Sequence, residues 1–365
     1  MKKKPVKKGS SPKKSYSMLI QLIVGLVISA VFIFITFRTL DFGKIWQSLL
    51  SANWFVVLIA VVVQIAALAL RGIRWGYLIP VNAKIRTSTL IEATYIGYMA
   101  NNIFPAKLGE IIRPYLLGKK EGISKTSAFA SIVMERIIDG LTVVGILFVI
   151  SFISPEILRN TKEALSLVAS FLGMKSAPAI DVRKVTTVGF LAVLALLGFM
   201  IFLRVGRSTA FGVVSFFLKP LPKKFSEKVI AVLHKFVDGI GFKPAPGSVP
   251  IMTGITVIYW ILISASLMIL LFAFPFGRAL PSPYLAALWV MCISGLGLSI
   301  PSAPSGIGTY EFAAIFGLVL CGIVPEDAAS VAILAHFVIG LIPQVIAGFI
   351  CLGISGVSFS EATKG

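Results

Sequence analysis

Long apolar runs, separated by shorter polar and basic segments, dominate the chain. Each run has about 18 or more residues, and a helix of that length crosses a hydrocarbon layer of about 30 Å because it rises 1.5 Å per residue. Strict alternation of polar and apolar residues, which is typical of barrel strands, is absent. The runs predict six full transmembrane helices, which are Ser17–Phe37, Trp54–Leu70, Ala130–Ile153, Val185–Leu203, Pro250–Phe274 and Ser330–Gly353.

Two further segments, Thr89–Leu117 and Pro283–Cys321, are apolar but interrupted by Asn, Pro and Gly in NNIFPAKLGE and SIPSAPSGIG. Irregular backbone at membrane depth is tolerated where it is buried in protein or lines a cavity. We therefore predict two broken helix pairs that enter the membrane and return. If these pairs cross the membrane fully instead, the chain has up to eight crossings and its two termini still lie on the same side. The pattern does not separate these alternatives.

Composition excludes a soluble domain. The 365 residues are 57% hydrophobic and only 13% charged, and the mean hydropathy is +0.95. Soluble chains have about 45–50% apolar residues. We predict an all-α polytopic membrane protein.

The net charge of +19 comes from 34 Lys and Arg against 15 Asp and Glu. The cations lie in loops and at helix ends, where they orient a membrane protein and contact anionic lipid, so nucleic acid is not an expected partner. The positive-inside rule places both termini in the cytoplasm, and we expect a multi-pass protein of the cell membrane. The densely basic segments that would share this side are Lys2–Lys14, Arg71–Arg86, Lys107–Lys125 and Arg204–Lys243.

The predicted organisation is a basic tail (1–16), a membrane domain (17–357) and a short second tail (358–365). Two loops carry apolar residues at helical spacing, Glu156–Leu172 and Lys224–Gly241. Such helices lie in the membrane interface or form a small cap on other loops, and both readings stay open.

An internal repeat is indicated by matches 200 residues apart, such as Gly122 with Gly322 and Gly140 with Gly340. Residues of about 54–153 would form the first repeat and about 250–353 the second. One residue of slippage upstream brings Pro105 onto Pro304. Since the two units start from opposite sides of the membrane, the repeats would be inverted, as in many transporters that bind substrate near the midplane.

Ionisable residues inside the membrane each cost about 2.5–3.5 kcal/mol on insertion scales, so a group of them needs a reason. Glu110 and Arg113 are one helical turn apart and are expected to pair. Such charges either only hold helices together, or line a polar cavity that binds an anionic head group, aided by free amides where the helix restarts after Pro105. The first repeat supplies Asn101, Asn102, Pro105, Lys107, Gly109, Glu110, Arg113, Glu135, Arg136 and Asp139.

In the second repeat, the backbone can turn and approach a ligand or a neighbouring helix closely at its Pro and Gly residues. A single intramembrane His is more often structural, but its alignment with Arg136 favours a functional role. The candidate residues here are Pro304, Gly306, Gly308, Glu311 and His336.

Four strings, in this order, resemble the lysylphosphatidylglycerol synthase transmembrane-region family of flippase-like proteins: LRGIRW, GYMANNIFPAKLGEIIRPYLL, SIVMERIIDGL and PSAPSGIGTYEFAAIFGLVL. The resemblance covers nearly the whole chain and points to most of the residues named above. It implies movement of an aminoacylated phospholipid between leaflets, or a role in polyprenyl-phosphate sugar pathways. Lys107 and His336 stand where the family often has Arg. Neither side chain can bind a phosphate with two parallel hydrogen bonds, as Arg does. Because the chain ends at Gly365, we expect no soluble synthase domain and no lipid synthesis.

The leading hypothesis is a lipid transporter whose polar groove carries a head group while the tails stay in the bilayer. An enzyme that transfers or hydrolyses a lipid head group, with Glu110 or Glu135 as base, is the second. The third is a non-transporting partner of a cell-envelope enzyme. HExxH, G-x-S-x-G and P-loop motifs are absent, so we expect no metal, no cofactor and no ATPase activity.

Overall fold

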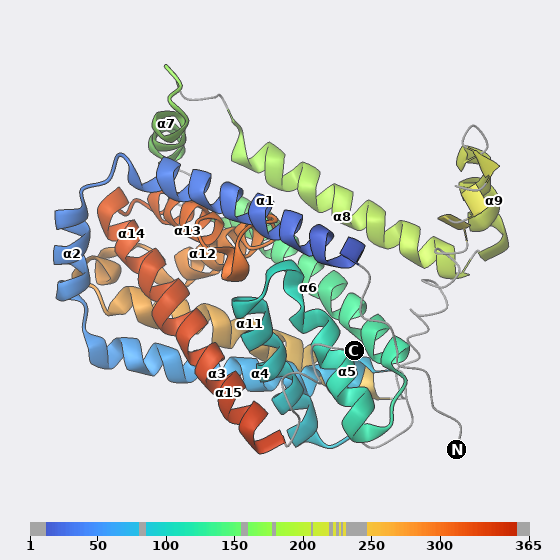
Figure 1. Ribbon diagram of the computed structural model, residues 1–365. Coiled ribbons are helices and arrows are strands. Elements are labelled where there is room, and N and C mark those ends of the chain that lie inside the picture. The colour runs from blue at the N-terminus through green and yellow to red at the C-terminus, as the bar shows by residue number, and fades with distance from the viewer. Residues whose placement is uncertain are drawn as a thin grey trace.

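The computed structural model describes residues 12–79, 85–154, 160–176, 180–205, 207–218, 222–223, 226–227, 229–230 and 247–355. Every regular element in these ranges is a helix (Figure 1). The first tail up to residue 11, the second tail (358–365) and most of the expected helix Lys224–Gly241 lie outside the described residues.

The first half of the chain folds into six helices and one short break. Asp41 and Asn53 begin α2 and α3 by accepting hydrogen bonds from backbone N–H groups of the first turn, which is the usual role of an N-cap. Gly122 ends α5 in a left-handed conformation, with φ of 69°. The elements are α1 (Pro12–Phe37), α2 (Phe42–Ser51), α3 (Trp54–Leu78), α4 (Thr87–Ile103), the 3₁₀ turn η1 (Pro105–Lys107), α5 (Gly109–Glu121) and α6 (Lys125–Ile153).

The second half contains the remaining helices and two further short turns. A π-helix, η5 (Leu334–Leu341), joins α14 to α15 without a break. The other elements are α7 (Thr161–Leu172), α8 (Val182–Val205), α9 (Arg207–Leu218), α11 (Ser248–Phe272), η3 (Pro275–Ala279), α12 (Pro283–Gly297), η4 (Pro304–Gly306), α13 (Thr309–Leu320), α14 (Pro325–Ile333) and α15 (Ile342–Ser355).

Helices α3, α6 and α11, most of α1 and the continuous rod from α14 to α15 are each long and apolar enough to cross a membrane. These five correspond to five predicted spans. The sixth predicted span, Val185–Leu203, falls within the continuous helix α8, and its insertion stays a prediction. One boundary was wrong, because α3 continues past Leu70 to Leu78 and carries Arg71 and Arg74 inside the protein.

Both interrupted segments break where the sequence predicts. The halves of each segment pack against each other, α4 on α5 and α12 on α13, and the breaks η1 and η4 are also in contact. The first pair is very close: a Cβ atom on Gly109 would lie 1.8 Å from the carbonyl oxygen of Gly97. Only glycine fits at this crossing.

The close approach of two helices occurs twice, at positions 200 residues apart in the sequence, which is the offset of the predicted repeat. Helix α4 approaches α5 at Gly97 and Gly109, and α12 approaches α13 at Gly297 and Thr309, where a Cβ atom on Gly297 would lie 2.6 Å from the Thr309 carbonyl oxygen. Gly122 and Gly322 both have positive φ after the second helix of the pair. The close crossings therefore recur at equivalent positions.

Helices α3 and α11, which belong to the two predicted repeats, run antiparallel. Asn53 at the start of α3 donates its N–H to Ala273 after the end of α11, at 2.8 Å. Near the middle, Ser266 Oγ donates to the carbonyl oxygen of Ala60 at 2.9 Å, and Arg71 further along α3 contacts Tyr259. This is the relation that an inverted repeat requires of its matching helices.

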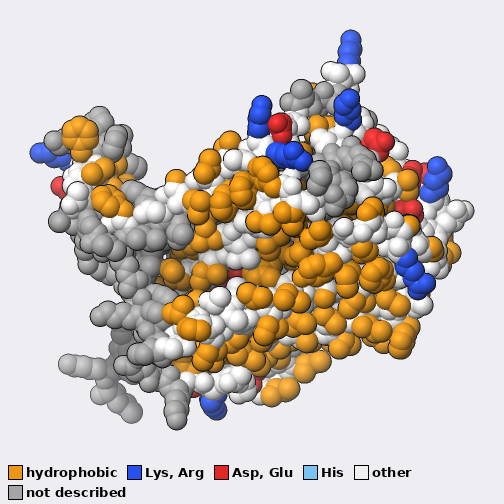
Figure 2. All heavy atoms as spheres, turned by 180° about the vertical axis from the view of Figure 1, so that it is seen from behind, with side chains coloured by type: hydrophobic (Ala, Val, Ile, Leu, Met, Phe, Trp, Pro, Cys, Tyr) orange, Lys and Arg blue, Asp and Glu red, His pale blue; other side chains and the backbone are white. Residues whose placement is uncertain are grey.

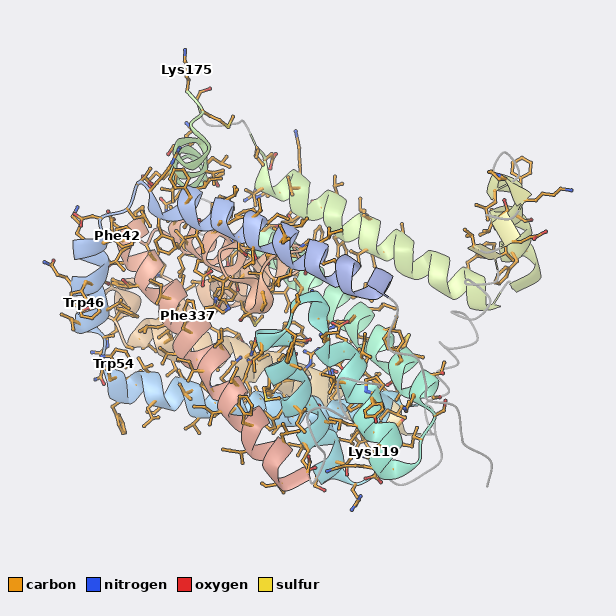
Figure 3. The ribbon with its side chains drawn as sticks, viewed as in Figure 1. Phe42, Trp46, Trp54, Lys119, Lys175 and Phe337 are labelled. Atoms are coloured by element: carbon orange, nitrogen blue, oxygen red, sulfur yellow. The ribbon has the colours of Figure 1, made fainter. Side chains whose placement is uncertain are left out.

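Hydrophobic side chains cover a broad outer face, with Lys and Arg at its edges (Figure 2). Phe55, with 71% of its surface exposed, and Val62 are among the apolar side chains that α3 presents outward. Phe42, Trp46 and Trp54 lie together at one end of the molecule, away from Lys119 (Figure 3). Exposed aromatic side chains of this kind mark the interface between lipid and water. The surface is that of a membrane protein.

Candidate functional site

Five buried charged residues form a cluster, which we call the arginine cluster, between helices of the first repeat. Arg71 and Arg74 come from α3, Arg113 from α5, and Glu135 and Asp139 from α6. Arg71 donates to Asp139 at 2.5 Å, and Arg74 does so at 2.8 Å. Glu135 accepts from Arg113 at 2.9 Å and lies 2.5 Å from Arg71.

Helical spacing brings these residues together. Arg71 and Arg74 are three residues apart on α3, and Glu135 and Asp139 are four apart on α6, so each pair shares one helix face. Glu135 lies ten residues after Lys125, or about 15 Å along α6 at 1.5 Å per residue. The cluster therefore lies about 15 Å from the start of α6.

The arginine cluster carries more positive than negative charge. Three guanidinium groups face two carboxylates, and all five side chains are at most 12% exposed. A buried charge that lacks a partner is expensive, so an excess cation inside a membrane protein calls for an anion.

Aromatic rings hold the arginines in place. The Arg113 guanidinium lies over the Trp75 ring, 4.4 Å from its centroid, and the Arg74 guanidinium lies 5.0 Å from the centroid of Tyr259. Tyr259 also accepts a hydrogen bond of 2.6 Å from Arg71. The Trp75 indole is fixed in turn, because it donates to Ser131 at 2.8 Å. These cation–π contacts leave the guanidinium edges available for hydrogen bonds.

Several guanidinium nitrogens of the arginine cluster have no hydrogen-bond partner in the part of the chain that the structure describes. They are Nε of Arg71, Nε and Nη1 of Arg74, and Nε and Nη1 of Arg113. Each such buried N–H costs about 1–3 kcal/mol, and more on a charged group. Phosphate and carboxylate oxygens form strong hydrogen bonds with guanidinium N–H groups. The cluster therefore offers unused donors to an acceptor oxygen.

The expected pair of Glu110 with Arg113 was wrong. Glu110 instead lies 2.9 Å from Arg136 of α6, and both side chains are partly exposed. Arg113 points inward to Glu135 and Trp75. Residues one turn apart on α5 are neighbours, but the packing of α6 offers each of them a partner of opposite charge.

At the start of α5, after the break in the first interrupted segment, some backbone N–H groups that were predicted to be free already have hydrogen-bond partners. Asn101 accepts a hydrogen bond of 2.8 Å from the N–H of Gly109, the first residue of α5. Asn102 donates to Gln344 of α15 at 3.0 Å, which ties the break to the second repeat. Pro105 begins η1, and Lys107 is exposed with φ of 50°. Lys107 thus lies outside the buried cluster.

The second repeat brings its candidate residues together in a different arrangement. Glu311 accepts hydrogen bonds from the N–H of Gly308 at 2.6 Å and pairs with His336 at 2.5 Å. Pro304 and Gly306 form η4 beside them. This group is separate in sequence and in contacts from the arginine cluster.

Sequence reasoning did not select Arg71, Arg74, Trp75 or Tyr259 as site residues. The signal for three of them was present in LRGIRW, whose Arg, Arg and Trp recur at i, i+3 and i+4 and so share a helix face. Tyr259 gives no such signal, because it is a single tyrosine in an apolar run and only the contact between α3 and α11 places it in the site.

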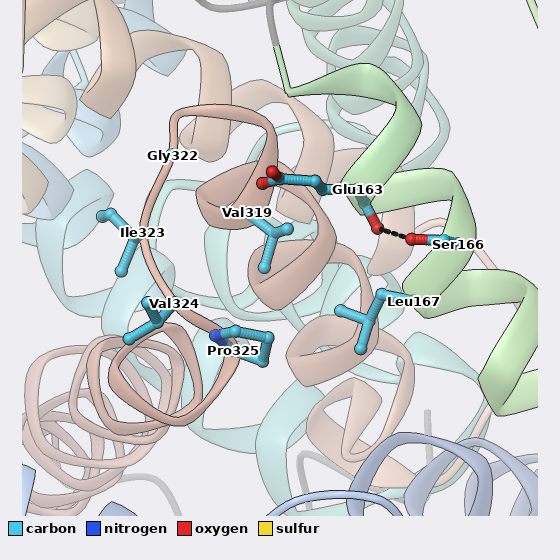
Figure 4. A pocket seen from close by; sticks show the side chains of 8 residues that line it. All are labelled: Glu163, Ser166, Leu167, Val319, Gly322, Ile323, Val324 and Pro325. Atoms are coloured by element: carbon cyan, nitrogen blue, oxygen red, sulfur yellow. Dashed lines mark hydrogen bonds between the residues drawn. The ribbon is translucent and has the colours of Figure 1, made fainter.

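An open cleft lies elsewhere, between α7 and the turn from α13 to α14 (Figure 4). Its volume is about 390 Å³, and its lining is mainly apolar with one carboxylate, that of Glu163. It contains no Lys or Arg, so it does not offer an anion site. Within the described part of the chain, no three His, Cys, Asp or Glu side chains are grouped so that they could hold a metal ion.

The sequence is similar to several known proteins. A UPF0104 membrane protein of Methanocaldococcus jannaschii is 25% identical over 90% of this chain and 93% of its own length. Glycosyltransferase AglD of Haloferax volcanii is 25% identical over 87% of this chain. The match covers 52% of AglD, so the chain spans about half the length of that relative. No solved structure matches the chain.

The family described as the lysylphosphatidylglycerol synthase TM region matches residues 22–348. This range includes α3 to α6 and α11 to α14, and with them the arginine cluster and the Glu311–His336 pair. The match agrees with the helical architecture and with the membrane spans. The chain therefore belongs to the lysylphosphatidylglycerol synthase TM region family.

Proposed function

We propose that this protein moves an anionic lipid between the leaflets of a membrane, and that the arginine cluster receives the lipid head group. The observation that carries the proposal is the set of buried guanidinium N–H groups without partners in a cluster with excess positive charge. A cluster that only held helices together would be stabilised by pairing all its donors.

The chemistry of the cluster favours a phosphate-containing head group. Three guanidinium groups against two carboxylates leave one net positive charge, which fits one phosphodiester. Arg74 and Arg113 each keep two unpaired nitrogens, Nε and Nη1, and the N–H groups on these atoms are donors for phosphate oxygens. An anionic or aminoacylated phospholipid, or a lipid linked to polyprenyl phosphate, carries such a group.

The surroundings of the cluster support entry from the bilayer. Arg136 and Glu110 are 42% and 28% exposed, and both belong to the helices that carry cluster residues. The broken helices meet at η1 and η4, as in transporters whose discontinuous helices line the substrate path. The head group would pass between the repeats while the tails stay in lipid.

The experiment is lipid movement in reconstituted vesicles. A fluorescent phosphatidylglycerol and its phosphatidylcholine counterpart are followed from one leaflet to the other, for the wild type, Arg74→Met and Arg86→Met. We expect the wild type to move the anionic lipid, Arg74→Met to lose most of that movement, and Arg86→Met to keep it. Arg86 is a matched control because its side chain is 68% exposed. Equal movement by the wild type and Arg74→Met would refute the proposal.

A second candidate function comes from the relative named Glycosyltransferase AglD. In this reading the chain is an enzyme acting on a lipid head group, with Glu110 or Glu135 as base, or the membrane partner of a cell-envelope enzyme. Both carboxylates are bound to arginines, which disfavours a role as base. Mass spectrometry of the vesicle lipids after incubation with a nucleotide sugar decides this: unchanged lipid masses favour transport, and a glycosylated lipid would favour the enzyme.

The proposed location is the cell membrane, with both termini in the cytoplasm. The support is the clustering of basic residues: Lys119, Lys120 and Lys125 lie at the end of α5 and the start of α6. The opposite end carries the aromatic side chains of α2 and the start of α3 (Figure 3). Positive segments are retained on the cytoplasmic side.

A further inference from the structure

The second repeat contains a buried acid–base pair that the arginine cluster does not use. Glu311 is 3% exposed and His336 is 6% exposed at their side chains. His336 Nδ1 lies 2.5 Å from a carboxylate oxygen of Glu311. On the other side of the ring, Nε2 lies 3.0 Å from Ser305 Oγ and 3.1 Å from the Ser305 carbonyl oxygen.

The arrangement of acceptors indicates that the two members of this pair share a proton. The Ser305 carbonyl oxygen only accepts, so Nε2 must carry a hydrogen to bond to it. A proton is then also needed between Nδ1 and the Glu311 carboxylate, because a lone pair on Nδ1 would face a negative oxygen. Whether that proton resides on the ring or on the carboxyl, the pair is neutral with it and negative without it.

The backbone around His336 is unusual on both sides of the contact. His336 lies in the π-helix η5, and π-helical turns occur frequently at functional sites. Ser305 has φ of 65°, a conformation that non-glycine residues rarely adopt. Glu311 also accepts from the N–H of Gly308, whose φ is 90°. The proton therefore lies at the point where η4, α13 and η5 are tied together.

Only α13 brings another titratable side chain into contact with His336 among the described residues. Tyr310 stacks on its ring, with the centroids 4.4 Å apart. Helix α15 contains no Asp, Glu, Lys or Arg. Glu326 and Asp327 of α14 lie nine to ten residues before His336, or about 14–15 Å along the rod.

The π-helix also packs against α3 and α11. Their charged and titratable groups near the cluster, Arg71, Arg74 and Tyr259, are bound to one another and to Asp139. Among the described residues, no hydrogen bond or ion pair joins these groups to Glu311 or His336.

We propose that the Glu311–His336 pair is a proton-binding site, and that release of its proton loosens the second break and is coupled to head-group movement. Without the proton, Glu311 repels the Nδ1 lone pair, and the contacts of His336 with Ser305 weaken. Since η4 packs against η1 and α4, this change reaches the first break. The coupling rests on the proposed transport function, whereas proton binding does not.

The first test observes the ring directly. The chain contains two histidines, so His234→Gln leaves His336 as the single ¹⁵N-histidine signal in NMR spectra of labelled protein. In spectra recorded from about pH 5 to about pH 9, we expect the ring ¹⁵N signals to report the loss of one proton from the pair. In Glu311→Gln, which lacks the second member of the pair, the dependence of these signals on pH should differ from that of the wild type. Ring nitrogens that do not change across this range would overturn the proposal.

The second test applies a pH gradient of one unit across vesicles in the lipid-movement assay. If one proton moves with each lipid, the ratio of fluorescent phosphatidylglycerol between leaflets should change by up to about tenfold. His336→Gln should move the lipid without responding to the gradient. A wild type that moves the lipid but ignores the gradient would overturn the coupling. Titration of His336 with no lipid movement at all would instead refute the proposed function and leave the proton site standing.

Discussion

Replacement of Arg113 by Met tests the anion site through binding rather than transport. Arg113 lies over Trp75 and donates to Glu135, with two nitrogens left unpaired. A hydrogen bond to a charged group contributes about 1.5–3 kcal/mol, so its loss should weaken binding of an anionic head group by about 10- to 100-fold. The fold should survive, because Glu135 keeps Arg71 at 2.5 Å.

The weakening of head-group binding can be measured in detergent, as the thermal stabilisation that a short-chain phosphatidylglycerol gives to each variant. At a lipid concentration of about 100 times the wild-type Kd, binding stabilises the folded protein by about 2.7 kcal/mol. With a Kd about 100-fold weaker, the same concentration gives only about 0.4 kcal/mol. Melting curves with and without lipid are compared for wild type, Arg113→Met and the exposed control Arg86→Met. If Arg113→Met gains as much stability from the lipid as the wild type does, the cluster is not the anion site.

The other predictions concern the break, the topology and pH. Gly109→Ala should lower the Tm strongly, because its Cβ would overlap the α4 backbone, whereas Gly140→Ala, which meets no atom within 4 Å, should have little effect. A cysteine at Asn160 should react with an impermeant maleimide only from outside the cell; labelling only from the cytoplasm would contradict the layout. Burial raises the pKa of Glu121, but hydrogen bonds from Thr89 and an arginine outweigh it and hold the pKa below its usual range. Ionised Glu121 therefore stabilises the fold fully at a pH above the pKa that it has in the unfolded chain. This stabilisation is lost as the pH falls through the lower pKa that Glu121 has in the folded protein. Glu121→Gln should consequently flatten the acid side of a plot of Tm against pH.

The spans and the breaks could be predicted from the sequence because both are local properties. Hydropathy over about 20 residues decides insertion, and Asn, Pro and Gly in NNIFPAKLGE interrupt the helix where they occur. The end of α3 was misjudged for the same reason: Arg71 and Arg74 end the apolar run, but acidic partners on α6 allow the helix to continue to Leu78. A local pattern does not show these partners.

The candidate site could be predicted only in part. Arg113, Glu135 and Asp139, which were selected from the sequence, lie together in one cluster, but the predicted partner of Arg113 was wrong, since pairing is decided by the packing of α3, α5 and α6. Spacing along one helix favoured Glu110 for Arg113, and the tertiary structure gives each a different partner. The role of Gly308, whose N–H is bound by Glu311, likewise depends on a backbone conformation that the sequence does not specify.

The position of a bound head group tests the central claim most directly. An electron cryo-microscopy structure in nanodiscs containing phosphatidylglycerol would show it. We predict a head-group phosphate within hydrogen-bond distance of the unpaired nitrogens of Arg74 and Arg113, roughly 2.7–3.2 Å from nitrogen to oxygen. A head group bound elsewhere in the protein, with the arginine cluster closed on itself, would contradict the account.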